Sequence, residues 1–290
     1  MSLSVVIIAH NEEANLGRTL ESVKPLVSDG KGEIIVVDSG STDRTIEIAK
    51  SFGAKVFVEE WKGFAAQKNS AIEKATGDWI LSLDADEEVD PELIAELTGH
   101  RDDAPPRGSV SREWCRTMGP GSADLELIKG QPVGFLIRRK NYFLGRWIKH
   151  GGFWPDTKLR LFLRGRGRFE SRLVHEDIRV DGLTRPIPHG ALLHHSYPTL
   201  SDYIDHMNRY SSLGAEMLVA KGKVQFSVIN IVLRPLATFV YNYFLRLGFL
   251  DGREGLLLHL YHAVYVSWKY AKAWELSRNQ LPPAHDRPVV

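Results

Sequence analysis

The sequence predicts an α/β fold in which helices cover a mostly parallel sheet, and three observations lead to this prediction. Short apolar runs alternate with stretches of helical periodicity over the first hundred residues. Glycines and capping residues separate these segments. The resulting order is β-α-β-α-β-α-β, which is typical of a parallel sheet with helices packed on it.

The expected elements follow one another closely. The spacing predicts strands at residues 3–9, 33–38, 54–60 and 79–84, and helices at 11–23, 41–53 and 62–77. Gly77 is expected to close the third helix. A fourth helix is expected to begin at Pro91, because proline is favoured in the first helical turn.

This alternation ends after His100. Residues 101–132 are rich in proline, glycine and charge, and they predict a long excursion that could serve as a mobile loop or lid. Strand-like segments resume at 133–139 and 158–164, and the chain is expected to be helical from Leu200 to about Ser277. We therefore expect three parts, 1–100, 101–222 and 223–290.

Composition excludes several classes of protein. The net charge of +1 over 290 residues shows no excess of positive charge of the kind that nucleic-acid-binding proteins carry. The single cysteine, Cys115, cannot form an internal disulfide and fits a reducing compartment. The N-terminus lacks a signal-peptide pattern, and no window offers about 20 uninterrupted apolar residues.

The motifs GxGxxG and GxxxxGK[ST] are absent, which counts against dehydrogenases and nucleoside-triphosphate hydrolases.

Polar residues follow three of the four expected strands. They are His10–Glu12, Asp38–Asp43 and Asp84–Asp86. All are expected at one edge of the sheet, where ligands of open parallel sheets bind. Asp84 and Asp86 crowd negative charge at the end of a buried strand, so either a cation compensates them or they are ordinary helix-start acids. Carboxylates in a D-x-D pair suit Mg²⁺ or Mn²⁺.

Several of these segments occur together in one family. The stretches VVIIAHNEEANLGRTLESV, IIVVDSGSTDRTIEIAKSFGA and GFAAQKNSAIEKATGDWILSLDADE, with the later VHED and NRYS, resemble the inverting family 2 glycosyltransferases. That resemblance implies the GT-A fold for nucleotide-diphospho-sugars. Downstream, NYFLGRWIKHGGFWPDTKLRLF and HHSYPTLSDYI resemble the bacterial lipopolysaccharide core β-1,4-glucosyltransferase group. Residues from about 101 to 132 fit neither pattern well.

The resemblance implies a donor site and a metal site. The main chain from Ala9 to Asn11 would line the base pocket, and Asp38 would contact the nucleoside. Asp86 would be the more direct metal ligand, with Asp84 nearer the ribose. The full set expected to bind the donor is Ala9, His10, Asn11, Glu12, Asp38, Lys68, Asn69, Asp84, Ala85, Asp86 and Arg209, and the set expected to bind the metal is Asp86, Asp84 and His194.

The resemblance also implies a catalytic carboxylate at Glu176 or Asp177, and we expect Glu176 to be the base. The acceptor hydroxyl must lose its proton as it attacks the anomeric carbon, and a carboxylate can accept that proton. Direct attack with one base inverts the anomeric centre, whereas a retaining double displacement needs a second carboxylate as nucleophile. Arg209 suits contact with a pyrophosphate.

Each assignment has a structural alternative. Asp38 could cap the following helix, and Glu176 could belong to a surface turn with Arg179. Histidines in strand-and-loop regions are often structural, so His194 could be structural as well. Trp147 and Trp154 could stack on a sugar or pack within a glycine-rich loop.

The C-terminal quarter combines apolar helices with basic and aromatic residues. This combination suits helices that lie in a membrane interface, and the alternative is a helical bundle packed against the catalytic part or a dimer partner.

The expected function is metal-dependent transfer of a hexose, glucose from UDP-glucose, onto a lipid A-core oligosaccharide in lipopolysaccharide biosynthesis. Residues 1–100 would bind the UDP-sugar, and 101–222 would bind the lipid-linked acceptor and supply the base. Residues 223–290 would keep a cytoplasmic protein peripheral on the inner membrane. The alternatives are a polyprenyl-phosphate glycosyltransferase and a non-catalytic membrane-associated scaffold with the same fold. The motifs do not encode the donor sugar or the oligomeric state.

Overall fold

The structure is a computed structural model. It describes residues 2–28, 30, 32–99, 131–170, 177–222 and 224–279. The chain divides into two compact units, of which the first comprises Met1–Arg139 and Asp156–His194 and the second Lys140–Pro155 and His195–Val290. The expected division at residues 100 and 222 separates donor binding, acceptor binding and membrane contact, and it stays a prediction. Most of the expected 101–132 excursion and the position of Cys115 lie outside the described residues.

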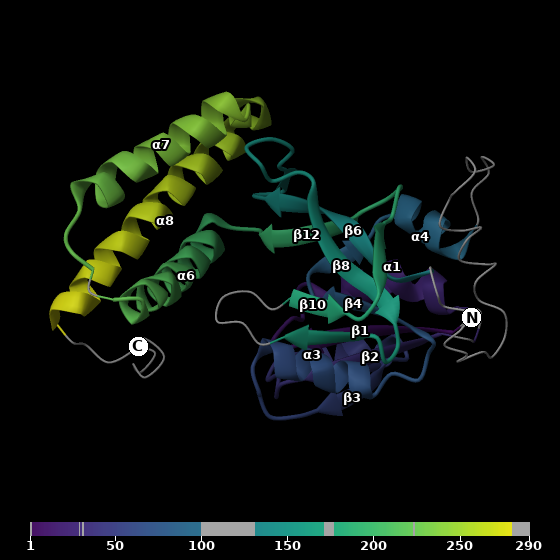
Figure 1. Ribbon diagram of the computed structural model, residues 1–290. Coiled ribbons are helices and arrows are strands. Elements are labelled where there is room, and N and C mark those ends of the chain that lie inside the picture. The colour runs from purple at the N-terminus through teal and green to yellow at the C-terminus, as the bar shows by residue number, and fades with distance from the viewer. Residues whose placement is uncertain are drawn as a thin grey trace. The chain divides into compact units, whose positions relative to one another are not determined.

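The first unit begins with the predicted alternation of strands and helices (Figure 1). Its strands are β1 (Leu3–Ala9), β2 (Glu33–Asp38), β3 (Lys55–Val58) and β4 (Trp79–Asp84), and its helices are α1 (Leu16–Val27), α2 (Thr45–Ser51), α3 (Phe64–Glu73) and α4 (Pro91–Thr98). The four strands are parallel neighbours in the order β3-β2-β1-β4. The parallel sheet expected from the sequence is therefore confirmed.

The second half of the sheet is mainly antiparallel, with β11 as a parallel neighbour of β6. Strand β8 pairs antiparallel with β4, and the order then continues β8-β6-β12-β5. The later strands are β5 (Glu87–Val89), β6 (Pro132–Phe143), β7 (Arg146–Trp147), β8 (Asp156–Leu163), β11 (Leu183–Pro186) and β12 (Leu192–Tyr197). Strands β9 (Gly167–Glu170) and β10 (Asp177–Val180) form a separate antiparallel pair.

Both faces of β1, β2 and β4 are buried, whereas the edge strand β3 is largely exposed. Val5 and Ile7 of β1 belong to one apolar cluster, which also contains residues of α1 and α4. Val6, between them in sequence, belongs to a second cluster that includes Ala71 of α3. Successive side chains of a strand point to opposite faces, so helices on both faces explain why these strands are almost wholly apolar.

One predicted helix boundary is confirmed and another is wrong. The fourth helix begins as predicted, because Asp90 caps it by accepting a hydrogen bond from Leu93 N at 2.8 Å, with Pro91 in its first turn. The prediction that Gly77 closes the third helix is wrong, since α3 ends at Glu73. Gly77 instead lies against β1, where an added Cβ would come within 2.8 Å of Ser4 N. Its lack of a side chain permits this close approach.

Glu33, at the start of β2, predicts a measurable acid sensitivity. Its carboxylate accepts hydrogen bonds from Ser4, Lys55 and Thr76. Burial opposes ionisation, but these donors lower the pKa of Glu33 from 4.5 to about 2. A lowered folded-state pKa contributes stability that is present above the unfolded value and is lost as pH falls from about 4.5 towards 2.

Replacing Glu33 with glutamine is therefore expected to lower the free energy of unfolding by about 1–2 kcal/mol at pH 7, with little effect near pH 2. The exposed Lys55 ammonium is screened by solvent, which keeps the loss below the value implied by the full pKa shift. Urea unfolding at several pH values measures this difference. A variant that loses equal stability at pH 7 and pH 2 contradicts the titration of Glu33.

The second unit is mainly helical, as expected after Leu200. Helix α6 (Leu200–Ala220) begins with a capping box in which Thr199 and Asp202 exchange hydrogen bonds. A continuous helical stretch then comprises η1 (Ile229–Leu233), α7 (Arg234–Val240) and η2 (Tyr241–Leu245), and η3 (Gly248–Asp251) leads into α8 (Gly252–Asn279). Both α6 and α7 pack on α8 (Figure 1). Among the described helices, none combines the length and apolarity needed to cross a membrane.

Candidate active site

The polar strand ends lie at one edge of the sheet, as expected. Ala9 of β1 is in register with Asp38 of β2, and Ile8 is in register with Asp84 of β4. Because β1 lies between β2 and β4, the three chain segments leave the sheet side by side. Open parallel sheets bind ligands at this edge.

The first two strand ends are tied together. Asn11, whose φ of +54° is left-handed, donates its N–H to Ser41 Oγ at 2.8 Å and accepts from Thr42 N at 2.9 Å. The buried Asp38 accepts hydrogen bonds from Gly40 N and Ser41 N, each at 2.8 Å, and from Ser41 Oγ. Asp38 thus shapes the turn after β2. Its contact with a nucleoside stays a prediction.

Glu12 faces the acids that follow β4. Its carboxylate is half-buried and accepts a hydrogen bond from Asn15. Burial raises the pKa of Glu12, and the negative charges of Asp86, Asp43 and Asp84 raise it further. His10, which directly follows β1, is exposed beside Asn11. This part of the sheet edge is therefore acidic.

Asp84 is held by two buried cations. One of its oxygens lies 2.7 Å from Lys68 Nζ and the other 2.5 Å from Arg160 Nη2. Burial alone would raise the pKa of Asp84, but Arg160 and Lys68 hold it well below its usual range. Each oxygen of Asp84 therefore already faces a protein cation, and the metal contact expected of Asp84 stays a prediction.

The cation Arg160 belongs to a larger buried network that the sequence interpretation did not assign. Its guanidinium also contacts Glu87, which is fully buried, and Glu87 accepts a further hydrogen bond from Arg139. Glu87 Oε2 accepts from Asp84 N at 3.0 Å, so it braces the turn that carries both acids. An arginine in the apolar strand KLRLFL was the available signal, because a buried arginine requires an acidic partner.

Asp86 has a different partner from Asp84. Its carboxylate lies 3.3 Å from His194 Nε2, and its side chain is 25% exposed. Burial tends to raise the pKa of Asp86, but His194 lowers it below its usual range. The intervening Ala85 is buried, and its carbonyl accepts from Thr19 Oγ1 at 2.7 Å, which fixes the turn.

The side chains beside Asp86 suit a divalent cation that the protein coordinates only in part. Within the part of the chain that the structure describes, no three His, Cys, Asp or Glu side chains gather as a metal site. Asp86 and His194, whose polar atoms lie 3.3 Å apart, would supply one oxygen and one nitrogen ligand. Mg²⁺ sites commonly use one or two carboxylates and leave the remaining positions to water and substrate phosphates. The donor set is therefore suited to a cation whose coordination a phosphate-bearing substrate completes.

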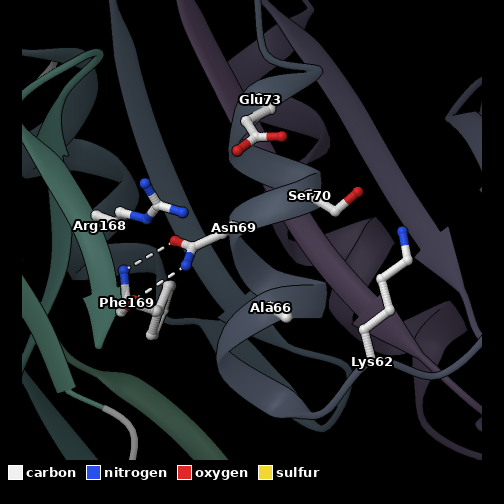
Figure 2. Close-up of a pocket in the computed structure, with 7 residues that line it drawn as sticks. All are labelled: Lys62, Ala66, Asn69, Ser70, Glu73, Arg168 and Phe169. Carbon is white, nitrogen blue, oxygen red and sulfur yellow. Dashed lines mark hydrogen bonds between the residues drawn. The ribbon is translucent and has the colours of Figure 1, made fainter. Parts of the chain in front are cut away.

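Lys68 and Asn69 are neighbours in sequence but serve different parts of the fold. Lys68 pairs with Asp84, as described above. Asn69 holds β9 against α3, because its amide accepts from Phe169 N and donates to Phe169 O, each at 2.9 Å. Figure 2 shows this pair of hydrogen bonds beside a hollow of about 450 Å³. Both polar atoms of Asn69 are thus engaged by the protein backbone.

The remaining expected residues are placed as follows. Glu176 lies outside the described residues, and Asp177 is exposed at the first position of β10. Arg209 is exposed on α6, in the second unit, beside the ring of Tyr210. The three histidines near β12 do not gather, since His189 lies near Glu92, His194 near Asp86, and His195 on the ring of Tyr142.

The sequence matches a known family over its first half. Residues 4–155 match the family described as Glycosyl transferase family 2. The chain is 31% identical over 284 residues to the lipopolysaccharide core biosynthesis glycosyltransferase LpsC of Rhizobium meliloti, covering 95% of this chain and 93% of LpsC. It is 29% identical to an uncharacterized glycosyltransferase of Rickettsia typhi, covering 95% of this chain and 87% of the relative.

Solved structures are more distant. The S. aureus TarS 1-349 structure is 14% identical, with a TM-score of 0.43 and coverage of 97% of this chain and 92% of that one. Glucosyl-3-phosphoglycerate synthase from Mycobacterium tuberculosis, in complex with Mn²⁺, UDP and phosphoglyceric acid, is 25% identical, with a TM-score of 0.31 and coverage of 49% and 43%. The family relationship therefore rests on the sequence matches.

Proposed function

Because the chain belongs to the family 2 glycosyltransferases, we propose that it transfers a hexose, glucose from UDP-glucose, with inversion onto a lipid A-core oligosaccharide. Its α/β sheet and C-terminal helices agree with the GT-A fold expected for this family. The identity of the sugar and of the acceptor is our proposal.

The observation that carries the proposal is the arrangement of Asp84 and Asp86. Both follow a buried strand, beside the turn that Asp38 shapes, yet they have different partners. Asp84 is neutralised by Lys68 and Arg160, whereas Asp86 pairs with His194. We propose that Asp86 and His194 hold Mg²⁺ or Mn²⁺ and that Asp84 helps to position the nucleotide.

This arrangement suits departure of a nucleoside diphosphate. As the bond to the anomeric carbon breaks, negative charge grows on the leaving phosphate, and a bound divalent cation would offset it. The protein itself keeps the turn from Asp84 to Asp86 rigid. Glu87 accepts a hydrogen bond from Asp84 N, and Thr19 donates one to the carbonyl oxygen of Ala85. A preorganised site need not reorganise as the charge develops.

The acceptor assignment rests on the relative. LpsC is a lipopolysaccharide core biosynthesis enzyme by its name, and the similarity covers nearly all of both chains. We propose the same substrate class here, with the chain acting as a peripheral protein at the cytoplasmic face of the inner membrane. Arg209 is proposed to contact the diphosphate.

The test is calorimetry with UDP-sugars, followed by mass spectrometry of products on truncated core acceptors. UDP-glucose is expected to bind with Mn²⁺ and to bind weakly in excess chelator. Absence of any metal-dependent nucleotide binding points to a non-catalytic scaffold and contradicts the proposal.

A matched pair of variants tests the base. Glu176→Gln is expected to keep donor binding and to slow transfer about a hundredfold or more, because a positioned base contributes at least that much. Asp177→Asn, which changes the neighbouring acid, is expected to retain transfer. The reverse result assigns the base to Asp177. An active Glu176→Gln enzyme favours an acceptor that is already ionised, such as a polyprenyl phosphate.

A further inference from the structure

The helical stretch formed by η1, α7 and η2 carries a continuous apolar face turned to solvent. We call it the outer apolar face. Ile229 is 65% exposed, Leu236 58% and Leu245 70%. Further exposed members are Val232, Leu233, Val240, Tyr241 and Phe244. Their spacing of three or four residues places them along one side of the helix.

The opposite side of the same stretch packs on α8. Ser267 of α8 donates to Ile231 O at 2.7 Å, Arg234 contacts Tyr270, and Pro235 is buried. A helix on the surface of a water-soluble protein normally turns its apolar stripe to the core and its polar face outward. Here the apolar stripe faces outward, and exposed patches of this size commonly mark an interaction surface.

The sequence that contains the outer apolar face carries charge of one sign. Between Met217 and Leu250 the sequence contains no Asp or Glu, but it contains the cations Lys221, Lys223, Arg234 and Arg246. A second copy of the chain would bring the same positive charges against them. An anionic lipid surface instead offers acyl chains to the apolar residues and phosphates to the cations.

We propose that the outer apolar face docks into the headgroup and acyl boundary of a membrane rich in anionic phospholipid. This inference builds on the proposed function, because a lipid-linked acceptor lies in such a surface. The tyrosine and phenylalanine side chains at Tyr241 and Phe244 suit the interfacial depth, and Arg246, beside Tyr241, can reach lipid phosphates.

The end of this stretch is fastened to the loop from Ile148 to Pro155. Gly151 N donates to Arg246 O at 2.9 Å, and Asp251 accepts from His150 N at 2.8 Å and from His150 Nδ1 at 2.9 Å. An added Cβ at Gly151 would lie 2.0 Å from the ring of His259, so this position has no room for a side chain. Docking of the outer apolar face therefore also positions this loop at the lipid surface.

The experiment is flotation of the full chain with vesicles. Vesicles of phosphatidylethanolamine and phosphatidylglycerol are expected to carry the protein, whereas vesicles of phosphatidylcholine alone carry less, and added salt reduces the difference. The triple variant Ile229→Ser, Leu236→Ser and Leu245→Ser is expected to bind the anionic vesicles at least about a hundredfold more weakly. Since these side chains are exposed, the substitutions should leave the fold intact.

The matched control replaces Val58 and Leu183 with serine. These side chains are also exposed but lie outside the outer apolar face, and vesicle binding should not change. Equal binding of the triple variant, or no preference for anionic lipid, overturns the proposal. The wild type could also form a dimer in sedimentation that is lost in the triple variant, while neither protein binds vesicles. That result shows that a second copy of the chain covers the face, and it overturns the proposal.

Activity separates this inference from the proposed function. Transfer to a deacylated, water-soluble core acceptor should be equal in the wild type and the triple variant, whereas transfer to acceptor embedded in vesicles should fall with binding. If the wild type transfers sugar to neither acceptor, the proposed function is contradicted. Vesicle binding by the wild type and the triple variant still tests whether the outer apolar face docks on a membrane.

Discussion

Replacing Asp86 with alanine is expected to slow sugar transfer at least about a thousandfold and to remove its dependence on added Mn²⁺. The carboxylate pairs with His194 and is partly exposed. Several kcal/mol of charge stabilisation at the leaving phosphate would be lost with the cation, and each 1.36 kcal/mol is about tenfold in rate. Initial rates across a Mn²⁺ titration, with calorimetry of UDP-glucose, measure both effects.

Two further variants make this test specific. Glu88→Gln removes a nearby acid that forms a surface pair with Arg18 at 3.7 Å, and its activity should remain close to that of the wild type. His194→Ala should weaken the response to Mn²⁺ while leaving the Asp84 contacts in place. Full activity of Asp86→Ala, or of the wild type in excess chelator, rules out this use of Asp86.

Replacing Arg160 with methionine is expected to lower the free energy of unfolding by about 3–5 kcal/mol, which is the usual loss when one partner of a buried ion pair is removed. Arg160 lies 2.5 Å from Asp84 and 2.6 Å from Glu87, and the side chain of Glu87 has no exposed surface. Methionine keeps much of the side-chain volume but leaves Glu87 with one cation fewer. Urea unfolding at pH 7 measures the loss.

The control is Arg18→Met, which removes an arginine from a partly exposed pair and should change stability by less than about 1 kcal/mol. Adding Glu87→Gln to Arg160→Met should recover part of the stability, because the buried charge is then removed. An Arg160→Met protein that unfolds at the same urea concentration as the wild type contradicts this account of the network.

The strands and their polar ends could be predicted because they depend on local patterns. The apolar runs at Leu3–Ala9, Glu33–Asp38 and Trp79–Asp84 became strands with the predicted boundaries. The helix predicted to begin at Pro91 does so, and Asp90 caps it. Capping involves residues three positions apart, so it is visible in the sequence.

The partners of the site residues could not be predicted. Arg160 follows Asp84 by 76 positions and reaches it only because β8 lies antiparallel beside β4. Asn69 reaches the backbone of Phe169 over 100 positions, since β9 packs near α3. A buried acid requires a compensating cation, but that requirement does not identify which cation provides it.

By itself, the sequence determined the α/β order, the parallel strands, the polar sheet edge and the family to which the chain belongs. Only the tertiary structure decided that Asp84 is neutralised by protein cations while Asp86 pairs with a histidine, and that the apolar side of α7 faces solvent. The physical reason is range. Secondary structure follows from neighbours within a few residues, whereas charge pairing and burial depend on which distant segments meet.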